Sequence, residues 1–269
     1  MELLNNIQGE ILEHLGRFGF LAVSQFRMLT GKSVGYLREM LGSLSRRGYI
    51  KSYRVEVTHK VRAENIYYLT GLGKEFLLAH KNVFADDIKL PVGTPLVVRD
   101  YFHRYHFVSV HISIYHYLKA YHIPLSFFLT YFDKTGSVKK GNLTAKTRIP
   151  LEGQGFFIPD GIFKTDSSLY LLEMYCDKDT KRILNSLAAH ARAIALGTPA
   201  MSFGMGKTNP YVLAVFAHDG IRQAVIKRLQ HNENFTPMSK LFFFASLEDV
   251  QKDCGNAWQT INGERLMFL

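Results

Sequence analysis

Apolar residues in the first fifty positions recur at the three- and four-residue spacing of amphipathic helices. A first helix is predicted over residues 4–16, with its apolar face formed by Ile7, Ile11, Leu12 and Leu15. A second, short helix is predicted over the sequence VSQFRML, and a third over SVGYLREMLGSLSRR. Ser33 can cap the third helix, Gly48 follows its end, and its buried stripe should be Leu37, Met40, Leu41 and Leu44.

The pattern then changes to two short β-like runs, YIKSYRVEV and ENIYYLT, and a further helix begins near Gly71. Three helices, a two-stranded basic hairpin and another helix are the order of a winged helix-turn-helix, which we expect over residues 1–84. Basic side chains crowd the third helix and the hairpin: Arg38, Arg46, Arg47, Lys51, Arg54, Lys60 and Arg62. Such side chains contact phosphates and base edges in DNA complexes. The alternative is a solvated basic face on a dimerisation module.

Residues 85–99 carry two prolines and a glycine without helical periodicity, which indicates an interdomain linker. The remainder, residues 100–269, predicts a second domain. Its expected elements are a helix over 101–121, a strand over 125–132, a hairpin over 155–178, a helix over 179–197, strands near 211–217 and 240–245, and a helix over 219–230 between them. This order predicts an α/β domain with antiparallel strands first and a crossover connection afterwards.

Composition and charge narrow the class of partner. The 269 residues are 47% hydrophobic and 21% charged, as in globular proteins, and the formal net charge is +10. That charge favours a polyanion, with nucleic acid ahead of an anionic membrane. The two cysteines are far apart, the first residues do not resemble a signal peptide, and no run reaches the roughly 18 apolar residues of a membrane span. We therefore expect a cytoplasmic protein without membrane insertion.

The stretch GFFIPDGIFKTDSSLYLLEMYCDK contains two acids within otherwise apolar strands. If TDSS is the hairpin turn, Lys164 lies opposite Leu169, and the same alignment sets Asp160 opposite Glu173 with Cβ atoms about 5 Å apart. A divalent cation between them would offset their repulsion, and oxygen ligands suit Mg²⁺ or Mn²⁺. Three alternatives stay open: IPDG as a plain turn, one protonated carboxyl group, or a shifted register.

An acid after proline on one strand and a second acid on the neighbouring apolar strand resemble the PD-(D/E)XK nuclease motif. Together with the N-terminal winged helix, the chain resembles the replication-relaxation family, which includes MOBC-type plasmid mobilisation relaxases. The resemblance implies a restriction-endonuclease-like core that nicks double-stranded plasmid DNA at an origin, during conjugative mobilisation or replication, with Mg²⁺ or Mn²⁺ bound by Asp160 and Glu173. It also implies other mobilisation or relaxosome proteins as partners.

One position departs from that family pattern. The lysine of the motif would fall at Tyr175 in this chain. Lys178 or Lys181, at the start of the next helix, could replace it in stabilising phosphate charge, and Asp177 could be a third metal ligand. Tyr175 also lies beside the acids, where a relaxase tyrosine would act, but no nucleophile can be assigned among fourteen tyrosines. The alternative function is a non-catalytic plasmid replication or transcription regulator that binds DNA through the winged helix.

Overall fold

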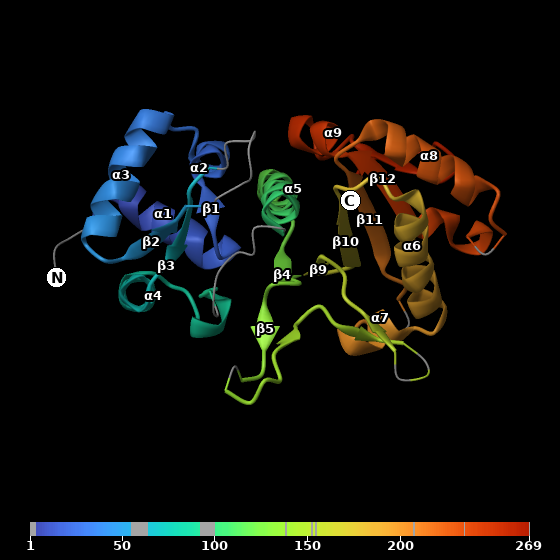
Figure 1. Cartoon of the computed structure of the whole chain (residues 1–269), viewed down its shortest axis with the longest axis horizontal. Helices are drawn as coiled ribbons and strands as arrows, with labels where there is room; N and C mark the ends of the chain where they lie inside the picture. The colour runs from blue at the N-terminus through green and yellow to red at the C-terminus, as the bar shows by residue number, and fades with distance from the viewer. Residues whose placement is uncertain are drawn as a thin grey trace. The chain divides into compact units, whose positions relative to one another are not determined.

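The protein divides into two compact units, Met1–Ile112 and Ser113–Leu269 (Figure 1). The computed structural model describes residues 4–54, 64–91, 100–137, 139–151, 153, 155–206, 208–233 and 235–268. The division falls within the long helix α5 (Tyr101–Ala120), whereas the first domain was predicted from the sequence to end at residue 84. Much of the expected linker, residues 92–99, lies outside the described residues.

The first unit combines helices with a small antiparallel sheet. Its helices before α5 are α1 (Asn6–Phe18), α2 (Val23–Thr30), α3 (Val34–Arg46), α4 (Gly71–His80) and the short 3-10 helix η1 (Ala85–Asp87). The sheet has the order β1-β3-β2, formed by β1 (Leu21–Ala22), β2 (Ile50–Tyr53) and β3 (Ile66–Leu69). These helices and the β2–β3 pair agree with the predicted order, and the expected connection THKVRA lies outside the described residues.

Local signals explain why these helices begin and end where they do. The Ser33 hydroxyl accepts a hydrogen bond from the Tyr36 amide at 3.3 Å and so caps α3 as predicted. Gly31 ends α2 in the left-handed conformation, with φ at 67°, which glycine adopts without strain. The apolar stripe of α3 is buried at Leu37, Leu41 and Leu44, whereas Met40 is only half-buried.

The second unit is built on a seven-stranded mixed sheet with the order β14-β13-β12-β11-β10-β9-β4. The three strands at one end, β4 (Leu125–Thr130), β9 (Gly161–Thr165) and β10 (Leu169–Tyr175), are antiparallel neighbours. Next to them β10, β11 (Tyr211–Phe216) and β12 (Phe242–Ser246) run parallel. At the other end β13 (Trp258–Thr260) and β14 (Arg265–Leu266) are antiparallel additions. Antiparallel strands followed by a crossover are as predicted; β13 and β14 were not predicted.

Helices α6 (Thr180–Ala195) and α8 (Asp219–Gln230) cover one face of this sheet (Figure 1). Their apolar stripes pack against alternate residues of the parallel strands, in a core that includes Leu171, Leu187, Val212, Phe216, Val225 and Phe244. All seven residues of β10 are buried, as expected for a strand covered on both faces. The sequence of β10 is therefore almost continuously apolar, and Glu173 is its one acid.

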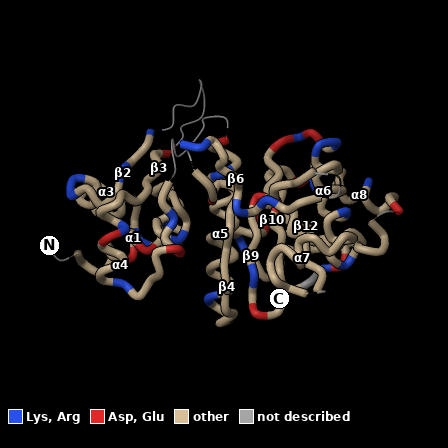
Figure 2. Tube along the Cα trace, turned by 90° about the horizontal axis from the view of Figure 1, so that it is seen from below, with Lys and Arg blue, Asp and Glu red and all other residues tan. Residues whose placement is uncertain are grey.

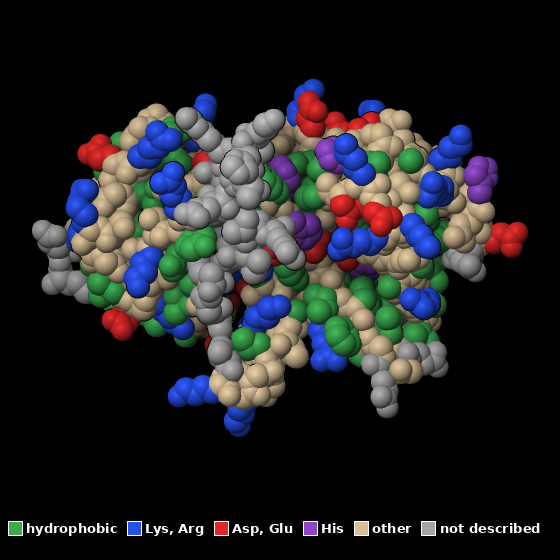
Figure 3. All heavy atoms as spheres, viewed as in Figure 1, with side chains coloured by type: hydrophobic (Ala, Val, Ile, Leu, Met, Phe, Trp, Pro, Cys, Tyr) green, Lys and Arg blue, Asp and Glu red, His purple; other side chains and the backbone are tan. Residues whose placement is uncertain are grey.

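Smaller elements complete the second unit. They are β5 (Lys134–Thr135), β6 (Thr144–Ala145), β7 (Ile149–Pro150), β8 (Phe156–Phe157), α7 (Thr198–Ser202), η4 (Thr236–Leu241) and α9 (Leu247–Lys252). Hydrophobic side chains gather at the surface around α7 (Figure 3). The exposed large hydrophobic residues of this unit include Phe156, Ile158 and, on α7, Met201. The chain is thus a mixed α and β protein. Within the described residues, no helix has both the length and the apolar character of a membrane span.

Candidate functional site

The hairpin of β9 and β10 has the register expected from the sequence. Strand pairs run from Leu169 opposite Lys164 to Leu172 opposite Gly161, and the turn closes with a 3.0 Å hydrogen bond from the Thr165 amide to the Ser168 carbonyl oxygen. Because Gly161 is the first residue of β9, Asp160 comes directly before the paired region, at the end of the hairpin remote from the turn.

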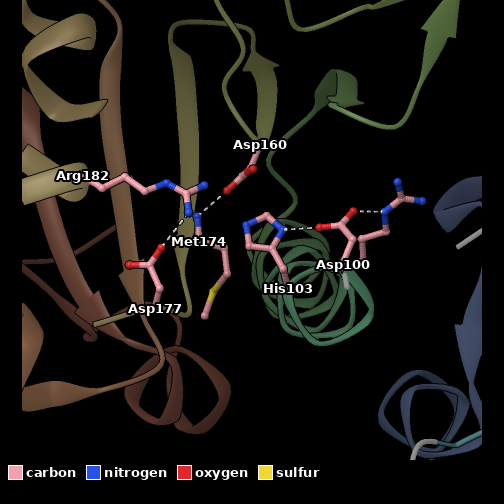
Figure 4. A network of polar contacts seen from close by, with 7 residues as sticks. Asp100, His103, Asp160, Met174, Asp177 and Arg182 are labelled. Carbon is pink, nitrogen blue, oxygen red and sulfur yellow. Dashed lines mark hydrogen bonds and ion pairs between the residues drawn. The ribbon is translucent and has the colours of Figure 1, made fainter. Parts of the chain in front are cut away.

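Asp160 is fixed by backbone hydrogen bonds on both of its sides. Its Oδ2 accepts a 2.8 Å hydrogen bond from the amide of Met174 on β10 (Figure 4). Its carbonyl oxygen accepts a 2.9 Å bond from the Tyr131 amide, just after β4. The side chain therefore lies across the edge of β10, beside the carboxyl group of Glu173. The recorded strand pairs end at Leu172 and Gly161, one position before the predicted pair of Asp160 with Glu173, and the two acids are neighbours there.

Glu173 is the buried member of the pair, with a relative exposure of 7%. Burial raises the pKa of its carboxyl group well above the usual range, and the neighbouring Asp160 carboxylate and the hydrogen bond between the two acids raise it further. The surroundings of Glu173 therefore oppose the ionisation of its carboxyl group. One protonated carboxyl group was among the alternatives that the sequence left open.

A third group, His190 on α6, contacts Glu173 from the helical layer. Its Nε2 lies 2.6 Å from Glu173 Oε1, and its side chain is fully buried beside the edge of the Phe157 ring. Burial lowers the pKa of His190 to about 3, so the imidazole is neutral. Its Nδ1 has no hydrogen-bond partner in the described part of the chain. This contact holds the imidazole of His190 against the Glu173 carboxyl group.

His190 was not predicted as a site residue, although the sequence of α6 contains a signal for it. The buried face of α6 contains Ile183, Leu187, Ala191 and Ile194 at helical spacing, and His190 lies on the same face. A histidine on an apolar helical face needs a polar partner from the facing layer. That partner is the acid within the apolar strand β10.

Asp177 is engaged elsewhere, although the sequence named it as a third metal ligand. Its Oδ2 accepts a 3.1 Å bond from Arg182 Nη1 (Figure 4), and its Oδ1 accepts a bond from the Asp179 amide. Across the described residues, no three His, Cys, Asp or Glu side chains cluster as a metal-binding group. The guanidinium group therefore neutralises Asp177 in this conformation.

The two lysines named as replacements for the motif lysine lie at the start of α6. Lys178 and Lys181 have exposed side chains there. The backbone amides of Lys181 and Arg182 are bonded to the side chain of the N-cap residue Asp179, at 3.0 and 3.1 Å. Because the Asp179 side chain already binds these two amides, they are not available to bind a phosphate. The ammonium groups of Lys178 and Lys181 are then the groups that could bind it.

Tyr175 occupies the position of the motif lysine, on the same face of β10 as Glu173. Its ring belongs to the core between the sheet and α6, and its hydroxyl group lies 3.0 Å from Ser186 Oγ. Burial and the nearby acid Glu173 raise the pKa of this phenol well above 10. Position 175 therefore supplies neither a cation nor a phenolate at neutral pH.

The carboxyl oxygens of this site are donors of the kind that a hard divalent cation prefers. Mg²⁺ is commonly held by one or two carboxylates, with water and substrate phosphate oxygens completing its coordination. Asp160 and Glu173 provide such a pair, and proton loss from Glu173 would accompany binding. Two protein ligands fit that mode of binding without Asp177.

The basic residues named for DNA contact belong to the first unit. Arg38 and Arg46 on α3 are exposed, as are Lys51 on β2 and Arg54 just after it. Arg47 is half-buried, and its guanidinium group lies 5.3 Å from the centre of the Tyr49 ring. Figure 2 shows basic positions at α3 and β2. Two further candidates, Lys60 and Arg62, lie outside the described residues.

Comparisons with protein-family models, with curated proteins and with solved structures found no match for this chain.

Proposed function

We propose that this protein is a metal-dependent DNA-nicking enzyme of the relaxase type, which acts at a plasmid origin during conjugative mobilisation or replication. The observation that carries the proposal is the shared site of Asp160 and Glu173 at the edge of β10. Two carboxyl groups held together at the end of a hairpin, beside a helix and a parallel crossover, are the arrangement expected of a restriction-endonuclease-like core.

The first unit supports the DNA-binding part of the proposal. Its element order of α1 to α3, the β2–β3 pair and α4 is that of a winged helix-turn-helix. In such a domain α3 is the helix that enters the major groove, and its exposed residues here include Tyr36, Arg38 and Arg46. Arginine reads guanine edges and contacts phosphates. Lys51 and Arg54 would then contact the backbone from the hairpin.

The chemistry assigned to the second unit depends on keeping two acids in one orientation. Asp160 and Glu173 would hold Mg²⁺ or Mn²⁺, which when bound supplies Lewis-acid activation of the scissile phosphate and of an attacking oxygen. The Met174 amide orients the Asp160 carboxylate, and His190 orients Glu173 from the buried side. Lys178 and Lys181, which are exposed at the start of α6, would balance phosphate charge.

The test is strand nicking by the full chain. A duplex that the protein selects from a random pool is cloned into supercoiled plasmid, which is incubated with Mn²⁺ or with EDTA. We expect open-circular product with metal only, and loss of at least a hundredfold in rate in Asp160→Asn and in Glu173→Gln, as for removal of a group that stabilises the transition state. Asp166→Asn, in the hairpin turn, is the matched control and should nick normally. Unimpaired nicking by both site variants would reject the assignment.

The second candidate is a non-catalytic DNA-binding regulator of plasmid replication or transcription. It is favoured by Tyr175 in place of the motif lysine and by the ion pair of Asp177 with Arg182. It predicts sequence-specific binding to the same selected duplex in EDTA, and an intact plasmid with either metal. Competition with an RNA duplex of the same sequence distinguishes both candidates from an RNA-directed nuclease.

A further inference from the structure

Aromatic rings form a continuous ladder across five adjacent strands of the large sheet. Phe128 on β4 stacks on Phe163 on β9, with ring centroids 5.2 Å apart, and Phe163 stacks on Tyr170 on β10 at 4.6 Å. Tyr170 stacks on Tyr211 on β11 at 5.5 Å, and Tyr211 contacts the edge of Phe243 on β12 at the same spacing. The face of β10 that carries Tyr170 is opposite to the face that carries Glu173, since the two residues are three apart in one strand.

The ladder is buried at one end and reaches the surface at the other. Phe163 and Tyr170 are at most 3% exposed, whereas Tyr211 and Phe243 are half-buried. At the exposed end lies an open cavity of about 420 Å³, within the roughly 300–1,000 Å³ range of ligand sites. Trp258 and Phe268, stacked on one another at 5.4 Å, line another part of it.

Polar groups stand at the rim of this aromatic cavity. Ser167 and Ser168, in the turn between β9 and β10, contribute hydroxyl groups to its lining. Lys240, an exposed residue of η4, contributes the cation among the lining residues. A cavity lined mainly by aromatic side chains, with hydroxyl groups and one ammonium group, matches a planar aromatic ring that carries an anion.

We propose that this aromatic cavity binds a nucleobase with its adjoining phosphate. The base would extend the ring ladder by stacking on Tyr211 and packing against Phe243, which is inclined at 63° to Tyr211, and Lys240 would contact the phosphate. Base–aromatic stacking with backbone contacts from lysine is the usual mode of single-stranded nucleic acid binding. The base can come from a free nucleotide or from unpaired DNA. This inference is independent of the metal site, which involves the opposite face of β10.

The experiment uses Trp258, the single tryptophan of the chain, as the reporter. The full-length protein is titrated with thymidine, with thymidine monophosphate and with a short thymidine oligonucleotide, and tryptophan emission is recorded. We expect a saturable change with the monophosphate or the oligonucleotide. Tyr211→Leu should weaken binding about tenfold or more, the loss expected for one base–aromatic stack, whereas Tyr211→Phe should retain it.

Matched variants test the phosphate contact and identify the source of the base. Lys240→Ala should weaken binding of the monophosphate but not of thymidine, and Lys252→Ala, at the end of α9, should change neither. Much tighter binding of the oligonucleotide than of the monophosphate assigns the cavity to single-stranded DNA, and equal binding assigns it to a free nucleotide. No saturable signal with any of the three probes, or equal affinity in Tyr211→Leu, would overturn the proposal. Asp160→Asn should bind as the wild type does, even if the metal assignment fails.

Discussion

Replacing His190 with glutamine should reduce the loss of stability that the second unit undergoes in acid. Burial lowers the pKa of this imidazole from 6.5 to about 3, so at intermediate pH the unfolded chain takes up a proton that the folded chain does not. The free energy of unfolding is therefore unaffected by the titration of His190 above about pH 6.5, and it decreases as the pH falls from 6.5 towards 3. At about 1.4 kcal/mol per pH unit, the uptake of this proton by the unfolded chain lowers the free energy of unfolding by about 3 kcal/mol between pH 7 and pH 4.5.

The assay is urea unfolding of wild type and His190→Gln over that pH range at constant ionic strength. Tryptophan emission reports the second unit, because Trp258 belongs to it. Glutamine keeps an amide that can reach Glu173 but has no titrating group. Between pH 7 and pH 4.5 the variant should therefore lose about 3 kcal/mol less of its free energy of unfolding than the wild type loses. The variant His231→Gln, at an exposed position, should follow the wild type.

A charged pair of His190 and Glu173 would give a different dependence of stability on pH. His190 Nε2 lies 2.6 Å from Glu173 Oε1, a distance that an imidazolium–carboxylate ion pair would also adopt. If the pair were charged, His190 would keep its proton in the folded state. Wild type and His190→Gln would then lose stability in parallel below pH 6.5, or the wild type would lose less. Either outcome would refute the neutral state of the imidazole.

Three other changes have defined outcomes. Gly73→Ala should destabilise the first unit by about 3 kcal/mol, because the added Cβ would lie 2.3 Å from a backbone carbonyl oxygen, whereas Gly71→Ala meets nothing within 4 Å and should be near neutral in thermal unfolding. Tyr175→Phe should cost about 1 kcal/mol for one lost hydrogen bond and leave plasmid nicking intact; loss of nicking would identify that hydroxyl as chemically active. Arg46→Ala with Arg54→Ala should reduce the slope of log affinity against log salt by about 1.8, and an unchanged slope would remove both residues from the DNA interface.

Much of the fold could be predicted because its signals are local. The cap at Ser33, the stop at Gly31 and the apolar periodicity defined α1 to α3 within a few residues. The hairpin register followed from one turn, TDSS, because a short turn fixes every pair along two strands. The predicted pair of Asp160 with Glu173 is the next position of that register, beyond the last recorded pair of Leu172 with Gly161.

The parts that escaped prediction depend on contacts between distant segments. His190 reaches Glu173 only because α6 packs on β10, and strand periodicity in β10 says nothing of which helix residue will face it. The ion pair of Asp177 with Arg182 joins a residue beyond the end of β10 to α6, and it was not predicted. The short strands β5 to β8 and the added strands β13 and β14 have too few residues for a periodic signal.

The most direct test of the metal assignment is a titration with Mn²⁺, followed by electron paramagnetic resonance of the free ion at several pH values. We predict one bound ion per wild-type chain, with affinity that rises with pH because Glu173 must release its proton, and loss of this binding in Asp160→Asn and in Glu173→Gln. Undiminished Mn²⁺ binding in both variants would contradict the account, and so would an affinity of the wild type that does not change with pH.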